Sequence, residues 1–260
     1  MSDRALRVGA LVRLNLLLLL REPGVLVSRL AMPVVLMLLL RPLYVAATAH
    51  GAGDGTTQAV TGMSVMFSLL ALSLVGSGIL RERAWNTWDR LRAGGAGPLE
   101  MLVGKAVPAL TFLVAQQVVV MSVGVLGLGL HVGNPSLLAV TVLGWVGTLL
   151  CVGTALGTFA RNLGELSAIQ DVGGLALTGL GGALVPLAVL PAWVHHVAEF
   201  SPGYWGVQSM RWALDGNAGG VFFAEFRARL LRNRRDRSRR MAHPPRLAAR
   251  PGYVRTARRA

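Results

Sequence analysis

Few residues of this chain have types and spacings that could do chemistry. His195, His196 and Glu199 are residue types that bind metal ions, but no further donor lies at a suitable spacing, so we interpret the histidines as an interfacial pair and assign no metal. The pair Gly104-Lys105 lacks the glycines and the following Ser or Thr of a phosphate-binding loop. No nucleophile has a base at a usable spacing. The sequence therefore predicts a protein that is not an enzyme and has no nucleotide-hydrolysing motif of its own.

A charged stretch at residues 81–92, RERAWNTWDRLR, is the most informative segment of the sequence. It lies between two apolar runs and belongs to a basic loop, which the preference of Lys and Arg for the cytoplasmic face places inside the cell. Such a segment can dock a soluble partner while its two ends transmit movement to the membrane. The alternative interpretation is a solvated loop whose arginines flank two helices. Just after it, Pro98 and Glu100 are typical of a helix N-terminus.

The elements on either side of this stretch are predicted to be membrane-spanning helices. Hydrophobic residues make up 53% of the 260 residues, and charged residues only 15%. A helix needs about 20 apolar residues to cross the roughly 30 Å of hydrocarbon in a bilayer. Such runs lie at residues 25–47, 60–80, 106–130, 137–160 and 167–190. The sequence therefore predicts an all-α polytopic membrane protein with five transmembrane helices.

Polar side chains inside these runs are candidates for function. Gln116 and Gln117 lie in the third predicted span, where an amide is costly unless it finds a partner or a wet cavity. One interpretation is hydrogen bonding between helices, and the other is contact with a substrate along a path through the bundle. Asp171 lies near the start of the fifth predicted span, and we expect it near the cytoplasmic interface with Arg161.

The regions outside the five runs differ from them in composition. Residues 2–22 place arginines among leucines and valines, which predicts a helix at the membrane surface. Residues 191–217 hold three tryptophans and two prolines, which predicts a re-entrant or interfacial segment. We predict a transmembrane domain over residues 1–216 and a disordered Arg-rich tail over residues 217–260. The net charge of +14 lies mostly in this tail and in short loops beside apolar runs, so it indicates membrane orientation and we expect no nucleic acid partner.

Two separated parts of the sequence resemble one known family. Residues 81–108, RERAWNTWDRLRAGGAGPLEMLVGKAVP, resemble the charged loop after the second span of permease subunits of type-2 ABC transporters, in particular the daunorubicin-resistance-like bacterial exporters. Residues 180–193, LGGALVPLAVLPAW, and 200–211, FSPGYWGVQSMR, are similar to that family's fifth span and the periplasmic segment after it. Order and span plan agree over residues 1–216. Two departures are Asn86, where the family has glycine, and Gly94-Gly95, where it has a small residue and proline.

The resemblance implies a permease subunit of an ATP-driven exporter that moves a hydrophobic drug or lipid-like substrate out of the cell, with drug or antibiotic resistance as a consequence. ATP and magnesium would bind to a separate ABC ATP-binding subunit. A second permease copy, in a homodimer or a heterodimer, would complete the transporter in the bacterial inner membrane, with the N-terminus in the cytoplasm. The positions that match the family's coupling loop, and would contact the ATP-binding subunit, are Glu82, Arg83, Thr87, Asp89, Arg90 and Leu91.

The end of the chain departs from the family plan of six spans. The sixth span is missing after about residue 220, where the Arg-rich tail follows. With a cytoplasmic N-terminus, five crossings would leave this basic tail outside the cell, against the positive-inside tendency. A truncated or frame-shifted end would explain this, and so would a genuine five-span variant. The alternative function is a membrane-anchored scaffold or regulator, or a truncated non-functional permease, whose cationic tail binds anionic lipid or nucleic acid.

Overall fold

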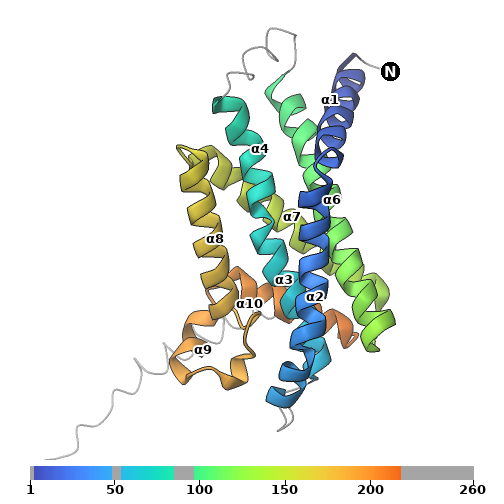
Figure 1. Cartoon of the computed structure of the whole chain (residues 1–260), viewed down its shortest axis with the longest axis vertical. Coiled ribbons are helices and arrows are strands. Elements are labelled where there is room, and N and C mark those ends of the chain that lie inside the picture. The colour runs from blue at the N-terminus through green and yellow to red at the C-terminus, as the bar shows by residue number, and fades with distance from the viewer. Residues whose placement is uncertain (1–2, 49–53, 85–96, 218–260) are drawn as a thin grey trace, which may run out of the picture. The chain divides into compact units, whose positions relative to one another are not determined.

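The computed structural model describes residues 3–48, 54–84 and 97–217, and in these ranges every regular element is a helix (Figure 1). The chain divides into two units, Met1–Val221 and Phe222–Ala260, and all the described residues belong to the first. The prediction of an all-α protein is therefore confirmed for the described part of the chain. The predicted tail, apart from Asn217, lies outside the described residues.

Two helices, α1 (Asp3–Leu20) and α2 (Pro23–Thr48), begin the fold. The carbonyl oxygen of Glu22 accepts hydrogen bonds from the amides of Val25 and Leu26, so α2 starts directly after α1 ends. The predicted N-terminal helix is confirmed as a helix, while its place at a membrane surface stays a prediction. In the bundle α1 packs along α6.

The second predicted span consists of two helices, α3 (Gly55–Leu70) and α4 (Leu72–Ala84). Asp54 caps α3, because its carboxylate accepts hydrogen bonds from the backbone amides of Thr56 and Thr57 at 3.1 and 3.0 Å. The sequence predicts one unbroken helix, but α3 ends at a joint at Ala71, which has a φ of −73° and a ψ of −8° and separates α3 from α4. The residue at the joint is neither glycine nor proline, so the sequence does not indicate an interruption there.

Helices α6 (Pro98–Leu128) and α7 (Pro135–Phe159) form the predicted hairpin. Gly129 follows α6 with a φ of 69°, the left-handed conformation that favours glycine. Asn134 starts α7, because its side-chain oxygen accepts a hydrogen bond from the Leu137 amide at 3.1 Å. The 31 residues of α6 measure about 46 Å at 1.5 Å per residue, so this helix is longer than the hydrocarbon core of a bilayer.

Helix α8 (Leu163–Leu180) is shorter than the fifth span that the sequence predicts, which runs to residue 190. The prediction is wrong at this end because Gly182 adopts a φ of 74° and the Ala183 amide donates back to the Thr178 carbonyl at 3.1 Å, which ends the helix. The short helices that follow are η1 (Leu187–Val189), α9 (Ala192–Ala198) and α10 (Pro202–Leu214).

Four stretches within the described ranges are long and apolar enough to cross a membrane, judged by length and composition. They are Pro23–Thr48, Gly55–Gly78, Leu99–Leu128 and Pro135–Phe159. These correspond to the first four predicted spans. Helix α8 is not among them, and its sequence is interrupted by Glu165, Gln170 and Asp171. A fifth crossing by α8 therefore stays a prediction.

The segment after α8 folds back against the bundle. Helix α10 packs against α3, α7 and α8. The Gln58 amide nitrogen donates to the Gly182 carbonyl at 2.8 Å, and the Tyr44 hydroxyl donates to the Leu184 carbonyl at 2.6 Å. Arg211 of α10 donates to the side-chain oxygen of Gln58. The turn after α8 is thus tied to α2 and α3, and Arg211 ties the predicted re-entrant segment to α3.

Candidate functional site

The charged stretch connects the end of α4 to the start of α6. The backbone of Glu82 and Arg83 belongs to the last turn of α4, but their side chains lie outside the described part of the chain. The other predicted coupling residues, Thr87, Asp89, Arg90 and Leu91, lie wholly outside it. The structure therefore describes the helices that hold this stretch and not its contact surface.

The start of α6 is fixed by Glu100. One of its carboxylate oxygens accepts a hydrogen bond from the Gly97 amide at 3.2 Å and lies 3.3 Å from Nε of Arg7 on α1. The first contact is the side-chain half of a capping box, which satisfies an amide that has no partner within the helix. The prediction that Pro98 and Glu100 begin a helix is confirmed. Arg7 adds a link to α1 that the sequence did not indicate.

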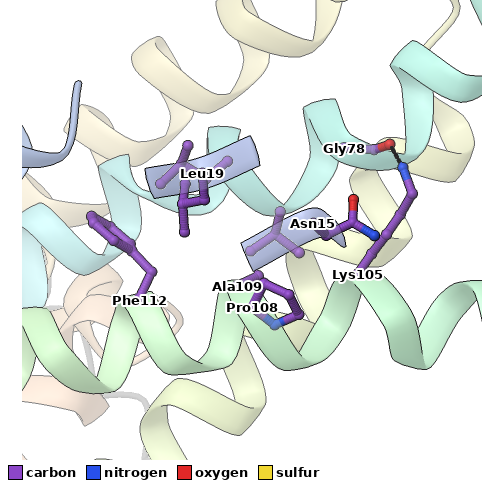
Figure 2. Close-up of a pocket in the computed structure, with 9 residues that line it drawn as sticks. Asn15, Leu19, Gly78, Lys105, Pro108, Ala109 and Phe112 are labelled. Atoms are coloured by element: carbon purple, nitrogen blue, oxygen red, sulfur yellow. Dashed lines mark hydrogen bonds between the residues drawn. The ribbon is translucent and has the colours of Figure 1, made fainter. Parts of the chain in front are cut away.

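Further along the contact between α1 and α6, these two helices run in the same direction. The Asn15 amide nitrogen donates to the carbonyls of Leu11 and Gly104, at 2.9 and 3.3 Å. The Lys105 ammonium group of α6 donates to the Gly78 carbonyl of α4 (Figure 2). These contacts join α1, α4 and α6 through residues in the first two turns of α6 and in α4.

A small cavity lies at this junction (Figure 2). Its volume is about 110 Å³, below the roughly 300 Å³ at which pockets for drug-sized ligands begin. It is lined by Asn15, Leu19, Leu74, Val75, Gly78, Lys105, Pro108, Ala109 and Phe112. This cavity is therefore too small to hold a drug-sized molecule, and we interpret it as a gap between packed helices.

Glycines bring α4 and α7 into close contact. A Cβ atom at Gly157 would lie 2.7 Å from the Gly76 carbonyl oxygen, and one at Gly76 would lie 3.2 Å from the Gly153 carbonyl oxygen. Gly153 and Gly157 are spaced as G-x-x-x-G, a pattern that lets two membrane helices approach closely. This pattern could have indicated the contact from the sequence, but it does not name α4 as the partner.

Gln116 and Gln117 both point into the bundle and are about 2% exposed or less. The Gln116 amide donates to the Arg29 carbonyl of α2, and the Gln117 amide donates to the Ser64 carbonyl of α3, each at 3.2 Å. Their side-chain oxygens have no hydrogen bond. Both residues thus make the interhelical bonds of the first interpretation, while contact with a substrate stays a prediction. Asp171 interacts electrostatically with Arg29, while its expected place near the cytoplasmic interface with Arg161 stays a prediction.

His195 and His196 lie on α9, with exposed side chains, and Glu199 follows that helix. The backbone carbonyl of Glu199 accepts a hydrogen bond from the Trp205 indole at 2.8 Å. Among the described residues, no group of three His, Cys, Asp or Glu side chains could hold a metal ion. The candidates for metal binding are thus not brought together with a further ligand in this part of the chain.

Comparison with known proteins gives one match, to the family described as ABC-2 type transporter, over residues 7–214. No curated protein and no solved structure matches the chain. The matched region contains every described helix except the first residues of α1, and its apolar helices agree with a multi-pass membrane component. Members of this family are transport permeases that pair with an ABC ATP-binding subunit and are not themselves catalytic. The chain therefore belongs to the ABC-2 type transporter family and is a transport permease subunit of an ABC system.

Proposed function

We propose that this permease is the membrane subunit of an ATP-driven exporter in the bacterial inner membrane, and that it moves a hydrophobic drug or lipid-like substrate out of the cell. The observation that carries the proposal is the course of the second span. It is the most buried of the four candidate spans, and its second half, α4, leads directly into the charged stretch. A movement of that stretch would therefore reach the centre of the bundle.

The mechanism rests on coupling between two sites. ATP and magnesium bind to the partner subunits, and closure of their dimer moves the docked stretches of two permease copies. This movement biases the spans between inward-open and outward-open arrangements. ATP shifts that balance only through its different affinities for the two states.

In this proposal the contacts with the ATP-binding subunit come from the charged stretch. The residues are Glu82, Arg83, Thr87, Asp89, Arg90 and Leu91. The N-terminus and the stretch lie in the cytoplasm, α8 is a fifth crossing, and Gln116 and Gln117 border the substrate path in another state of the transporter. A daunorubicin-resistance-like substrate class is suggested by the sequence motifs alone.

Capture of the partner tests the proposal. The full chain in detergent or nanodiscs is mixed with a purified ABC ATP-binding subunit from the same organism, and the bound fraction is measured. We expect Glu82→Lys with Asp89→Lys to reduce binding at least about tenfold, because two acidic contacts become repulsive. The matched control is Glu199→Lys with Asp215→Lys, which makes the same charge change at residues predicted to lie on the other side of the membrane.

Two results would contradict the proposal. One is a wild-type permease that captures no ATP-binding subunit, and the other is a double variant in the charged stretch that binds as well as the wild type. Binding of the wild-type chain to anionic vesicles or nucleic acid that weakens steeply with salt, without capture of the subunit, would instead support the scaffold function.

A further inference from the structure

Side chains from three neighbouring helices form a connected group beside the joint at Ala71. Two of them donate to the first residues of α4. The Arg29 guanidinium of α2 donates to the Ser73 hydroxyl at 3.1 Å, and the Gln170 amide of α8 donates to the Leu72 carbonyl at 3.0 Å. The third is Gln116 of α6, which donates to the Arg29 carbonyl at 3.2 Å. We call Arg29, Gln116 and Gln170 the joint clamp.

The two glutamines of the joint clamp are buried, while Arg29 is half-buried and lies near an opposite charge. Gln116 and Gln170 are each 2% exposed. Asp171, next to Gln170 on α8, interacts electrostatically with Arg29. Polar groups at this depth are costly in a membrane protein unless they are paired, so their presence at one point of the second span calls for an explanation.

Gly76 makes room for the clamp one turn further along α4. A Cβ atom at Gly76 would lie 2.9 Å from the amide nitrogen of Gln170 and 3.2 Å from the Gly153 carbonyl of α7. The start of α4 is therefore held between α8 on one side and α7 on the other, as Figure 1 also shows for the helices. The end of α4, which leads into the charged stretch, extends beyond this fixed point.

Gln117 makes a comparable hydrogen bond to the second span, but away from the joint. Gln117 and Gln170 have the same residue type, similar burial, a donor bound to a backbone carbonyl of the second span and an oxygen without a hydrogen bond. Gln117, however, binds Ser64 in the middle of α3, where the helix is continuous. The two residues differ in whether they hold the joint.

We infer that the joint clamp sets the direction in which α4 leaves α3, and thereby positions the charged stretch for coupling to ATP hydrolysis. This inference rests on the proposed function. Arg29, Gln116 and Gln170 are positioning residues that act through α4, and this role is separate from the substrate path proposed for Gln116.

The first test needs only the permease. In a Cys151→Ser background, spin labels are placed at Ser77→Cys on α4 and Leu99→Cys at the start of α6, and the full chain is studied in nanodiscs by pulsed electron resonance. We expect Gln170→Met and Ser73→Ala to broaden or shift the distance distribution between the labels. The matched variant Gln117→Met should leave it as in the wild type. Equal distributions in all variants would overturn the inference.

The second test uses the complex with the ATP-binding subunit. The measured quantity is the ATPase rate of the complex divided by the rate of the subunit alone. We expect Gln170→Met and Ser73→Ala to change this ratio by roughly twofold to tenfold, since substitutions in coupling networks act on this scale. Ser68→Ala, which removes the acceptor of the Trp145 indole within α3 and away from the joint, should change it less than either.

The outcomes separate the clamp from the proposed function. If the wild-type permease binds the subunit and alters its ATPase rate, but Ser73→Ala and Ser68→Ala give the same ratio, the inference is overturned. If the wild-type permease neither binds the subunit nor alters its rate, the proposed function fails, and the distance measurement alone decides whether the clamp sets the direction of α4.

Discussion

Glu100 combines two contacts in one carboxylate at the start of α6. It closes the capping box with Gly97 and pairs with Arg7 on α1. The ion pair is partly exposed, with the Arg7 side chain 40% and the Glu100 side chain 13% exposed, and pairs of this kind contribute only about 0–1 kcal/mol. The capping contact is therefore the larger of the two contributions to stability.

Substitution of Glu100 should separate the two contacts. Glu100→Gln keeps an acceptor for the Gly97 amide and loses the ion pair, so we expect a loss of less than about 1 kcal/mol. Glu100→Ala loses both, and we expect about 1 kcal/mol more because the cap is also lost. Denaturant unfolding of the purified chain measures both. Equal losses for the two variants would show that the capping contact contributes nothing.

Asp54 caps α3, and its contacts lower the pKa of its carboxyl group. Partial burial raises the pKa of Asp54, but hydrogen bonds from Thr57 and Thr56 and the charge of Arg41 outweigh it, so the pKa lies below its ordinary value. A lowered pKa in the folded state means that the charged carboxylate stabilises the fold. That contribution is complete above the ordinary value of about 3.9 and is lost as the pH falls through the lower folded value.

The pH dependence can be assigned to Asp54 by two variants. Asp54→Ala should cost about 1 kcal/mol at neutral pH because the N-cap is lost. Asp54→Asn keeps a capping oxygen without a titrating charge, so it should cost less at neutral pH and weaken the loss of stability below about pH 4. Thermal unfolding between neutral pH and pH 3 tests this. An identical pH profile for wild type and Asp54→Asn would contradict it.

At the scale of elements, the contact between α4 and α7 depends on the absence of side chains. Gly76, Gly153 and Gly157 let the two helices approach, and membrane helices gain stability from such close packing because apolar side chains gain little by leaving lipid. The charged stretch follows α4 directly, so this contact also restricts where the stretch can lie.

Gly157→Ala should therefore destabilise the fold. Its Cβ atom would lie 2.7 Å from a backbone oxygen of Gly76, and backbone cannot move aside cheaply, so we expect a loss of about 1–3 kcal/mol. Gly147→Ala on the same helix is the control, because a Cβ atom there meets nothing within 4 Å and alanine favours the helix. Thermal stability in detergent measures both, and an equal effect of the two changes would refute the close-packing argument.

At the scale of the whole molecule, the second span receives donors along its length from the helices around it. The donor and acceptor pairs are Arg211 to Gln58, Gln117 to Ser64, Trp145 to Ser68, Gln170 to Leu72, Arg29 to Ser73 and Lys105 to Gly78. These bonds connect the segment after α8 at one end of the span with the junction of α1, α4 and α6 at the other. A conformational change at one end of the second span can thus act on the other end through this buried span.

The proposed orientation makes a prediction about the whole chain. In a Cys151→Ser background, Ser136→Cys at the start of α7 should react with a membrane-impermeant maleimide in intact cells. Gly164→Cys at the start of α8 should react only after the cells are permeabilised. The reverse pattern would place the charged stretch outside, and equal reaction of both would contradict a crossing by α7.

The sequence by itself determined the helical class, the first four spans, the turn at Asn134 and the helix start at Glu100. These features depend on hydropathy and on contacts between residues that are close in the sequence. Packing against other helices does not change them. The tertiary structure decided the joint at Ala71, the end of α8 at Leu180 and which span is central. Pro23–Thr48 and Gly55–Gly78 have nearly equal mean hydropathy, yet 11% of one window and 72% of the other are buried. Lipid and protein neighbours are both apolar, so hydropathy cannot distinguish a helix that faces lipid from one that faces other helices.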